Sequence, residues 1–168
     1  EQHVFAPLGM FETGFGAPGT PGGVDQPWGH WDLGGTYDPV PPGPDADNPQ
    51  AIGPAGTVHT TLNDYALFMM AHIDGARGVP GIVTVPTFEM LHTAVADGYA
   101  LGWGVGTESW ARGLVLGHAG SNVRWWAAVR LAPERNAGVF LVINAAGRAE
   151  IAADLIGDLL VERFEATP

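Results

Sequence analysis

The chain has 168 residues, is 46% hydrophobic with six tryptophans, and carries a formal net charge of −11. Its length corresponds to one domain, at roughly 150 residues per domain, and its apolar content excludes a wholly disordered chain. The negative charge disfavours nucleic-acid partners and anionic membrane surfaces, because both attract clusters of Lys and Arg. The absence of cysteine excludes disulfides, thiolate metal sites and a cysteine nucleophile.

The N-terminal third of the chain is rich in Gly and Pro. Glu1–Met10 is typical of a helix end that stops at Pro and Gly. Gly16–Gly53 has little periodicity, which predicts a long loop within the domain (16–53), and loops of this length are commonly functional or mobile. Its aromatic residues either anchor the loop to the body or line a pocket, so Trp31 is a candidate substrate-binding residue.

Three helices are expected after this loop. Thr61 with Asp64 resembles a capping box, and apolar residues at helical spacing follow as far as Gly75, which is expected to end the helix. A second helix begins near Pro86, a residue tolerated in the first turn. The last spans roughly Arg148–Phe164, and is expected to pack on a sheet through Ile151, Leu155, Leu159 and Leu160.

Strand-like runs lie between the second and the last helix. Tyr99–Val105 has glycine at alternate positions, and Leu114–Gly117, Trp125–Leu131 and Val139–Ile143 are predicted to be three successive antiparallel strands. Val139–Ile143 is apolar on both faces, which predicts a central strand with cover on each side. No run reaches the ~18 apolar residues of a transmembrane helix, so no membrane-spanning segment is expected. The sequence predicts an α/β protein of the α+β type, with helices packed on an antiparallel sheet.

The stretch Leu114–Asn122 carries the strongest functional signal. Its apolar run ends in a small polar cluster with glycines on both sides of His118, and glycine lets a ligand approach the backbone. His118 is either an active-site residue or a structural histidine at the strand end. Ser121 is not expected to be a nucleophile, because G-x-S-x-G is absent and the sequence places no base beside it.

The other histidines show no metal-binding spacing, so neither a metal nor a cofactor is predicted. Each is expected on the surface or on a helix face, and Asp32 is a candidate to pair with His30. These histidines are His3, His30, His59, His72 and His92.

Gly117-His118-Ala119-Gly120-Ser121-Asn122 resembles the H-x-G form of the K-T-G box of serine β-lactamases, penicillin-binding proteins and their esterase relatives, close to the class C branch. Upstream segments resemble the family in the same order: Pro7-Leu8-Gly9-Met10, Pro54-Ala55-Gly56 and Tyr99-Ala100-Leu101-Gly102-Trp103. The resemblance covers nearly the whole chain but only the C-terminal part of the family's domain. It implies that 1–168 is a single partial domain of the β-lactamase/DD-peptidase-like fold.

The resemblance also implies roles for individual residues. The family's H/K-x-G strand forms one wall of the active site, and the residue after its Gly supplies a backbone N–H to the oxyanion hole. His118, Gly120 and the Ser121 N–H therefore correspond to catalytic positions, and Asn122 to a substrate-binding position. Ala119 replaces a frequent Thr, which weakens the case for β-lactams and leaves esters or other amides open.

The family's nucleophile lies in an S-x-x-K box, which a Y-x-N box follows. This chain has no Lys, and neither Tyr37, Tyr65 nor Tyr99 begins a Y-x-N. The resemblance thus implies a serine hydrolase that acts on a small ester or amide through an acyl-enzyme. Its nucleophile comes from a missing N-terminal half or from a second chain, and a periplasmic or secreted location is expected by resemblance only. The alternative is a non-catalytic partner-binding or scaffold module of the same fold that self-associates through an open sheet edge.

Overall fold

A computed structural model describes the backbone of residues 1–165, and the side chains of all of these except 150, 152–154, 164 and 165. Residues 166–168 of the predicted domain lie outside the described part. The principal elements are α1 (Phe5–Leu8), β1 (Gly14–Phe15), β2 (Gly29–Asp32), β3 (Tyr37–Val40), α2 (Gly53–Gly56), β4 (Val58–His59), α3 (Leu62–Ala76), α4 (Val85–His92), β5 (Gly104–Glu108), β6 (Gly113–Ser121), β7 (Trp126–Ala132), β8 (Ala137–Ile143) and α5 (Arg148–Glu165). Two 3-10 turns, Gln50–Ile52 and Pro133–Arg135, complete the described structure.

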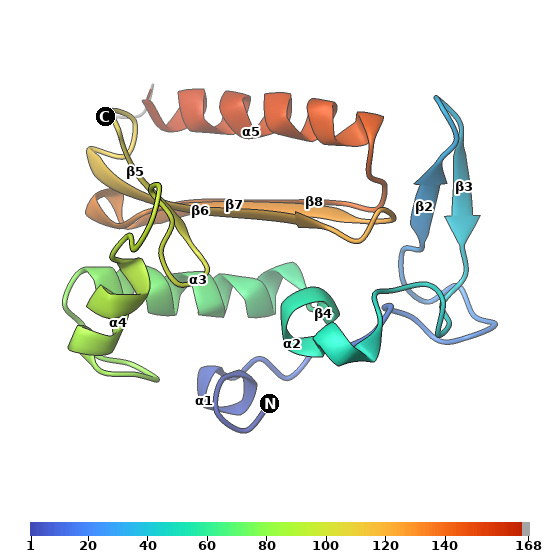
Figure 1. Cartoon of the computed structure of the whole chain (residues 1–168), viewed down its shortest axis with the longest axis horizontal. Helices are drawn as coiled ribbons and strands as arrows, with labels where there is room; N and C mark the ends of the chain where they lie inside the picture. The colour runs from blue at the N-terminus through green and yellow to red at the C-terminus, as the bar shows by residue number, and fades with distance from the viewer. Residues whose placement is uncertain (166–168) are drawn as a thin grey trace.

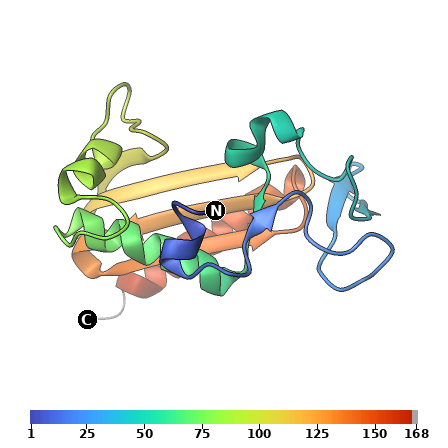
Figure 2. The same cartoon turned by 90° about the horizontal axis from the view of Figure 1, so that it is seen from below.

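An antiparallel sheet with the strand order β5-β6-β7-β8 forms the middle layer of the molecule. α5 lies along one face of this sheet and α3 along the other (Figure 1). Seen from below, the strands lie side by side and the loop between α4 and β5 projects from one margin (Figure 2). This arrangement confirms the predicted α+β class with helices packed on an antiparallel sheet. None of the helices in the described part is long and apolar enough to cross a membrane.

The main hydrophobic core lies between α3 and the sheet. Leu116 and Leu131 face each other across β6 and β7, and both are fully buried. Around them gather Met69, Ile73, Ala100, Trp103 and Val129. A smaller cluster of Trp110, Ala111 and Ala132 on the other face packs against Val161 of α5. The two clusters hold β6 and β7 between the helix layers.

The start of α3 is as predicted, but its end is not. The Thr61 hydroxyl accepts a hydrogen bond from the Asp64 N–H, which confirms the predicted cap. The helix runs through Gly75 to Ala76. Gly75 is required for packing, because a Cβ there would lie 2.3 Å from the ring of Phe88 on α4. The prediction that Gly75 ends the helix was therefore wrong.

Three expectations about the strands also need correction. β5 begins at Gly104, because Gly102 takes a left-handed conformation (φ +93°) that turns the chain after Tyr99. β6 does not stop at Gly117 but continues through Ser121. β8 is the outer strand of the described sheet, not a central one. Its two apolar faces are explained by α3 and α5, which cover the sheet from both sides (Figure 1).

α5 packs on the sheet through a different face from the one predicted. Leu155 and Leu159 are each 61% exposed, and Ile151 is exposed as well. Val161 instead contacts the sheet-side cluster, and Gly157 borders Val139 and Leu141 of β8. The sheet-facing side of α5 therefore carries Gly157 and Val161 rather than the predicted leucines.

The segment predicted to be a long loop contains a β-hairpin. β2 and β3 pair from Gly29↔Val40 to Asp32↔Tyr37 and stand beyond one end of the main sheet (Figure 1). β1 and β4 form a second short pair. The rest of 16–53 is irregular apart from the turn Gln50–Ile52.

Candidate active site

The polar end of β6 has an open backbone edge. β5 pairs with β6 only as far as Gly117, whereas β7 pairs with β6 through Ser121. His118, Ala119, Gly120 and Ser121 therefore have a strand on one side and none on the other among the described residues. All four are exposed. Their free edge is accessible to a ligand.

The side chains of this stretch alternate between the two faces of the sheet. His118 pairs with Val129 on the α3 side, whereas Ala119 pairs with Ala128 on the α5 side. A space of about 400 Å³ adjoins the stretch, and its lining includes small residues (Gly117, Ala119, Ala128), the aromatic residues Tyr99 and Trp126, and Arg130. The Tyr99 and His118 ring centroids are 6.4 Å apart. Small residues and aromatic rings in this lining suit a flat organic group.

The turn after β6 is fixed by side-chain hydrogen bonds. The Ser121 hydroxyl donates to the Trp125 carbonyl at 2.9 Å and accepts the Val123 N–H at 3.0 Å. Asn122 Oδ1 accepts the N–H groups of Arg124 and Trp125. These bonds stabilise Val123 in a left-handed conformation (φ 65°), which is uncommon for a β-branched residue. The Ser121 hydroxyl thus has a structural role here.

The direction of the Ser121 N–H follows from the same turn. The Asn122 N–H donates to the Trp125 carbonyl on the β7 side at 3.3 Å. Because successive N–H groups of an extended strand point to opposite edges, the Ser121 N–H points to the open edge. A backbone donor is therefore available at the point where β6 is unpaired.

The β2–β3 hairpin is attached to the far end of this turn. The His30 N–H donates to the Arg124 carbonyl at 3.1 Å, and the Arg124 guanidinium lies 4.3 Å from the Trp31 ring centroid. Gly29 lies so close that a Cβ there would be 2.5 Å from Trp125 Nε1. From the loop after β3, the Asp47 carboxylate accepts a hydrogen bond from Asn122 Nδ2 at 2.8 Å. The 16–53 segment thus braces the turn that follows Ser121.

Asp32 does not pair with His30, contrary to the sequence expectation. His30 Nδ1 lies 2.9 Å from the Asn144 carbonyl oxygen. The Asp32 carboxylate accepts hydrogen bonds from the N–H groups of Arg148, Gly34 and Gly35. These bonds, that of Arg148 most of all, lower the pKa of Asp32. Asp32 therefore links the hairpin to the start of α5.

Two of the other histidines lie on helices, His72 on α3 and His92 on α4, and are buried together between them. His72 Nδ1 and His92 Nε2 are 2.9 Å apart, and the two residues are only 6% and 8% exposed. Phe68, Phe88 and Trp103 surround His72. Burial lowers the pKa of His72 to about 4, with a smaller contribution from His92.

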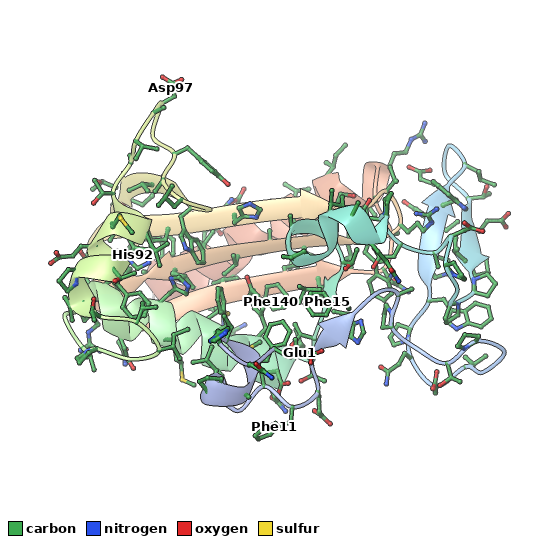
Figure 3. The ribbon with its side chains drawn as sticks, turned by 60° about the horizontal axis from the view of Figure 1, so that its bottom comes forward. Glu1, Phe11, Phe15, His92, Asp97 and Phe140 are labelled. Carbon is green, nitrogen blue, oxygen red and sulfur yellow. The ribbon has the colours of Figure 1, made fainter. Side chains whose placement is uncertain are left out.

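This histidine pair joins α3 to α4 at the end of the sheet away from the hairpin (Figure 3). In the described part of the chain, no three His, Cys, Asp or Glu residues are grouped so that they would hold a metal ion.

The structure brings some of the predicted site residues together and separates others. His118, Gly120 and Ser121 share the open edge, and Asn122 fixes the adjoining turn. Trp31 lies on the hairpin beneath Arg124 and does not line the space beside His118. Sequence reasoning missed Tyr99 and Trp126. The alternation along a strand predicts that Trp126 and Ala128 lie on one face, but it does not predict the space beside them.

Comparisons with known proteins agree on the fold. The family model described as "Beta-lactamase" matches residues 1–161. The chain is similar to the octameric penicillin-binding protein homologue from Pyrococcus abyssi, with 21% identity and a TM-score of 0.65 over 95% of this chain and 36% of that one.

A protein described as SurE gives 21% identity and a TM-score of 0.66, over 97% of this chain and 38% of that one. The chain thus spans a little over a third of the length of these two structures. No curated protein matches it.

Proposed function

Because the chain belongs to the β-lactamase family, we propose that it supplies one wall of a serine-hydrolase active site. The substrate is a small ester or amide, and the reaction passes through an acyl-enzyme. In this proposal the chain contributes His118, Gly120 and the oxyanion-hole N–H of Ser121. The nucleophile comes from a polypeptide that carries S-x-x-K and Y-x-N, and the two together are called the assembled hydrolase below.

The open edge of β6 is the observation that carries this proposal. A tetrahedral intermediate develops negative charge on the former carbonyl oxygen, and an N–H that already points there stabilises it without reorganisation. The Ser121 N–H has no strand partner on that side among the described residues, and the braced turn behind it restricts its movement. Gly120 has open space where a Cβ would lie, so a substrate can approach the backbone.

His118 is proposed to bind or orient the substrate within the site. Its ring is exposed next to Tyr99, and a histidine donates a hydrogen bond in its neutral or charged form. Asn122 is proposed to hold the turn that positions the Ser121 N–H. Trp31 is proposed to contact a part of the substrate that extends past Ser121. Ala119 offers no hydroxyl to the substrate, which favours esters and simple amides over β-lactams.

Neither serine of this chain is proposed as the nucleophile. Ser109 and Ser121 are its two serines, and the chain has no lysine to activate them. In the proposed reaction an external Ser attacks the carbonyl carbon, the alcohol or amine leaves with a proton, and water then releases the acid. The two similar structures are almost three times as long as the matched part, which leaves ample chain for a nucleophile segment.

Covalent labelling tests this division of roles. The chain alone and the assembled hydrolase are incubated with a fluorophosphonate and with a penicillin, and their intact masses are measured. We expect the chain to stay at 17.6 kDa, and the fluorophosphonate to modify the Ser of S-x-x-K in the assembled hydrolase. Adduct formation on Ser109 or Ser121 would refute the proposal.

A further inference from the structure

α5 carries an apolar stripe on the side that faces away from the sheet. Gly157 borders β8, and Leu155 and Leu159 each lie two residues from it, which turns them about 200° around the helix axis. Both leucines are 61% exposed, and Ile151, one turn earlier, is 67% exposed. α5 forms an outer layer of the molecule, and no element of the described chain lies over it (Figure 1). A row of exposed aliphatic residues along one helix is typical of an interaction surface.

Charged residues of opposite sign stand at the two ends of this stripe. Arg148 lies seven residues before Leu155, Glu162 lies seven residues after it, and both are exposed. Residues seven apart remain on one side of a helix, which is the spacing used by helices that pack side by side. Arg148 is held at its end of α5, because its backbone N–H donates to the Asp32 carboxylate. The stripe is therefore positive at its N-terminal end, apolar in the middle and negative at its C-terminal end.

This order of charges is complementary to a second copy of itself in one direction only. With a two-fold axis at Leu155, Arg148 lies opposite Glu162 of the second copy, and Ile151 lies opposite Leu159 of the second copy. Leu155 then meets its own counterpart at the axis. A parallel pair would instead place the two Arg148 side chains together and the two Glu162 side chains together, and like charges repel. The residues of α5 thus favour an antiparallel pair.

The charge and size of the surface bear on how tightly two copies bind. Each copy has a net charge of −11, so there is no general attraction between copies, and the local Arg148–Glu162 pairs have to supply the electrostatic match. Three exposed aliphatic side chains from each copy bury less than the ~1,200 Å² at which stable interfaces begin. We therefore expect a reversible dimer rather than a permanent one.

We propose that α5 is a self-association surface, through which two copies of the chain form a two-fold symmetric dimer. The two α5 helices pack antiparallel with Leu155 at the axis, Ile151 and Leu159 fill the contact, and an Arg148–Glu162 pair closes each end. The contact is on the side of α5 away from the sheet, so it does not involve the open edge of β6. The proposal does not depend on the proposed hydrolase function.

Cysteine cross-linking tests the direction of the contact. The chain has no cysteine, so each variant carries a single thiol. Leu155→Cys should form a disulfide-linked dimer under mild oxidation, because the two thiols meet at the axis. Met90→Cys, at a similarly exposed apolar position on α4, is the control and should remain monomeric.

Two further variants distinguish the antiparallel pair from a parallel one. Ile151→Cys and Leu159→Cys should each stay monomeric when oxidised alone, because identical thiols lie about 12 Å apart along antiparallel helices. The two variants should link to each other when mixed. If each links to itself instead, the helices are parallel and the inference is overturned.

Sedimentation at increasing chain concentration measures the affinity. The chain should shift from a monomer toward a species of twice its mass. Leu155→Gln with Leu159→Gln should weaken association at least about tenfold, because aliphatic burial is lost on both copies. Leu62→Gln with Met90→Gln, at similarly exposed positions on α3 and α4, should change it less than twofold. Circular dichroism checks that both double variants remain folded.

A charge exchange tests the paired ends. Glu162→Arg should weaken the dimer about three- to tenfold, since Arg148 then faces a like charge. Arg148→Glu added to the same chain should restore the affinity, because the charges are then exchanged rather than removed. A double variant as weak as Glu162→Arg alone would overturn the assigned pairing.

Other outcomes would overturn the surface itself. These are a chain that stays monomeric at every concentration, and a dimer that Leu155→Gln with Leu159→Gln leaves unchanged. A third is slowed hydrogen exchange of α5 that depends on the nucleophile-bearing polypeptide and not on the concentration of this chain. Because no reaction is measured, a failed dimer and a failed hydrolase proposal remain distinguishable.

Discussion

The sheet has two open stretches of backbone, and their surroundings differ. The end of β6 is polar and contains glycine, and it adjoins a space of about 400 Å³ with aromatic walls. The edge of β8 is apolar on both faces and lies between the layers formed by α3 and α5 (Figure 1). Both offer unpaired N–H and C=O groups, but only the first has a braced turn and an isolated donor.

This difference shows that an open edge does not by itself determine what binds there. At β6, Asn122 and Asp47 hold the turn, and the adjoining space combines aromatic residues with exposed backbone groups, which suits a small organic substrate. At β8, by contrast, the apolar side chains pack against the helix layers on the two faces of the sheet, and no comparable space is lined by polar groups in the described part.

The largest effect is expected at the Ser121 N–H. Ser121→Pro removes this N–H without breaking a described strand pairing, since proline is tolerated where the donor faces outward. Loss of one oxyanion donor should lower kcat of the assembled hydrolase by roughly 100- to 1,000-fold. Ser121→Ala keeps the N–H and should lower kcat less than about tenfold. If both variants lose activity equally, the hydroxyl and not the N–H is required.

A large pH effect is expected at the buried histidines, which join α3 to α4. Burial lowers the pKa of His72 from 6.5 to about 4, so the folded state disfavours the proton that the unfolded state accepts. Stability is then fully present above pH 6.5 and is lost as the pH falls toward 4, by roughly 3 kcal/mol. Urea unfolding at several pH values measures this.

His72→Gln is the matched variant for that experiment, because Gln retains hydrogen-bonding groups but does not titrate. The fall in unfolding free energy between pH 6.5 and pH 4 should be much smaller in this variant. An unchanged pH dependence would assign the effect to other groups.

A moderate effect is expected where the hairpin meets the turn after β6. Gly29→Ala would place a Cβ 2.5 Å from Trp125 Nε1 and 2.9 Å from Arg124 Cβ. Such overpacking should destabilise the chain by about 1–3 kcal/mol, and Trp fluorescence should change as the hairpin separates from the turn. Gly43→Ala, in the same segment but in open space, is the control. Equal losses in the two variants would show that the hairpin does not brace the turn.

The smallest effect is expected at the Arg130–Asp158 ion pair. Arg130 Nη1 and Asp158 Oδ1 are 3.1 Å apart, and the two side chains are 42% and 61% exposed. Asp158→Asn should therefore cost less than about 1 kcal/mol, and high salt should reduce the difference. A larger, salt-independent loss in thermal unfolding would mean that Asp158 is needed for the packing of α5.

Local signals in the sequence predicted much of this structure. Thr61 and Asp64 are three residues apart, so the cap of α3 depends on the local chain alone. The alternation along β7 and the continuous apolar run of β8 likewise placed these strands within a few residues of their observed bounds. The family resemblance carried by His118 to Asn122 agrees with the matching family model.

Features that depend on distant residues were not predictable in this way. Gly75 looks like a helix end, but it is needed because Phe88 packs on it from α4. The sheet-facing side of α5 carries Gly157 and Val161, so its larger apolar residues were assigned to the wrong face. The β2–β3 hairpin is attached by Asn144, Arg148 and Arg124, all about a hundred residues away in sequence.

The structure of the assembled hydrolase with a bound boronate would test the central claim most directly. A boronate forms a tetrahedral adduct with the nucleophilic serine and imitates the charged intermediate. The account predicts the adduct on the Ser of S-x-x-K, with one boronate oxygen about 2.7–3.1 Å from the Ser121 nitrogen. A boron bonded to Ser121 Oγ, or a Ser121 N–H donating to a protein carbonyl, would contradict it.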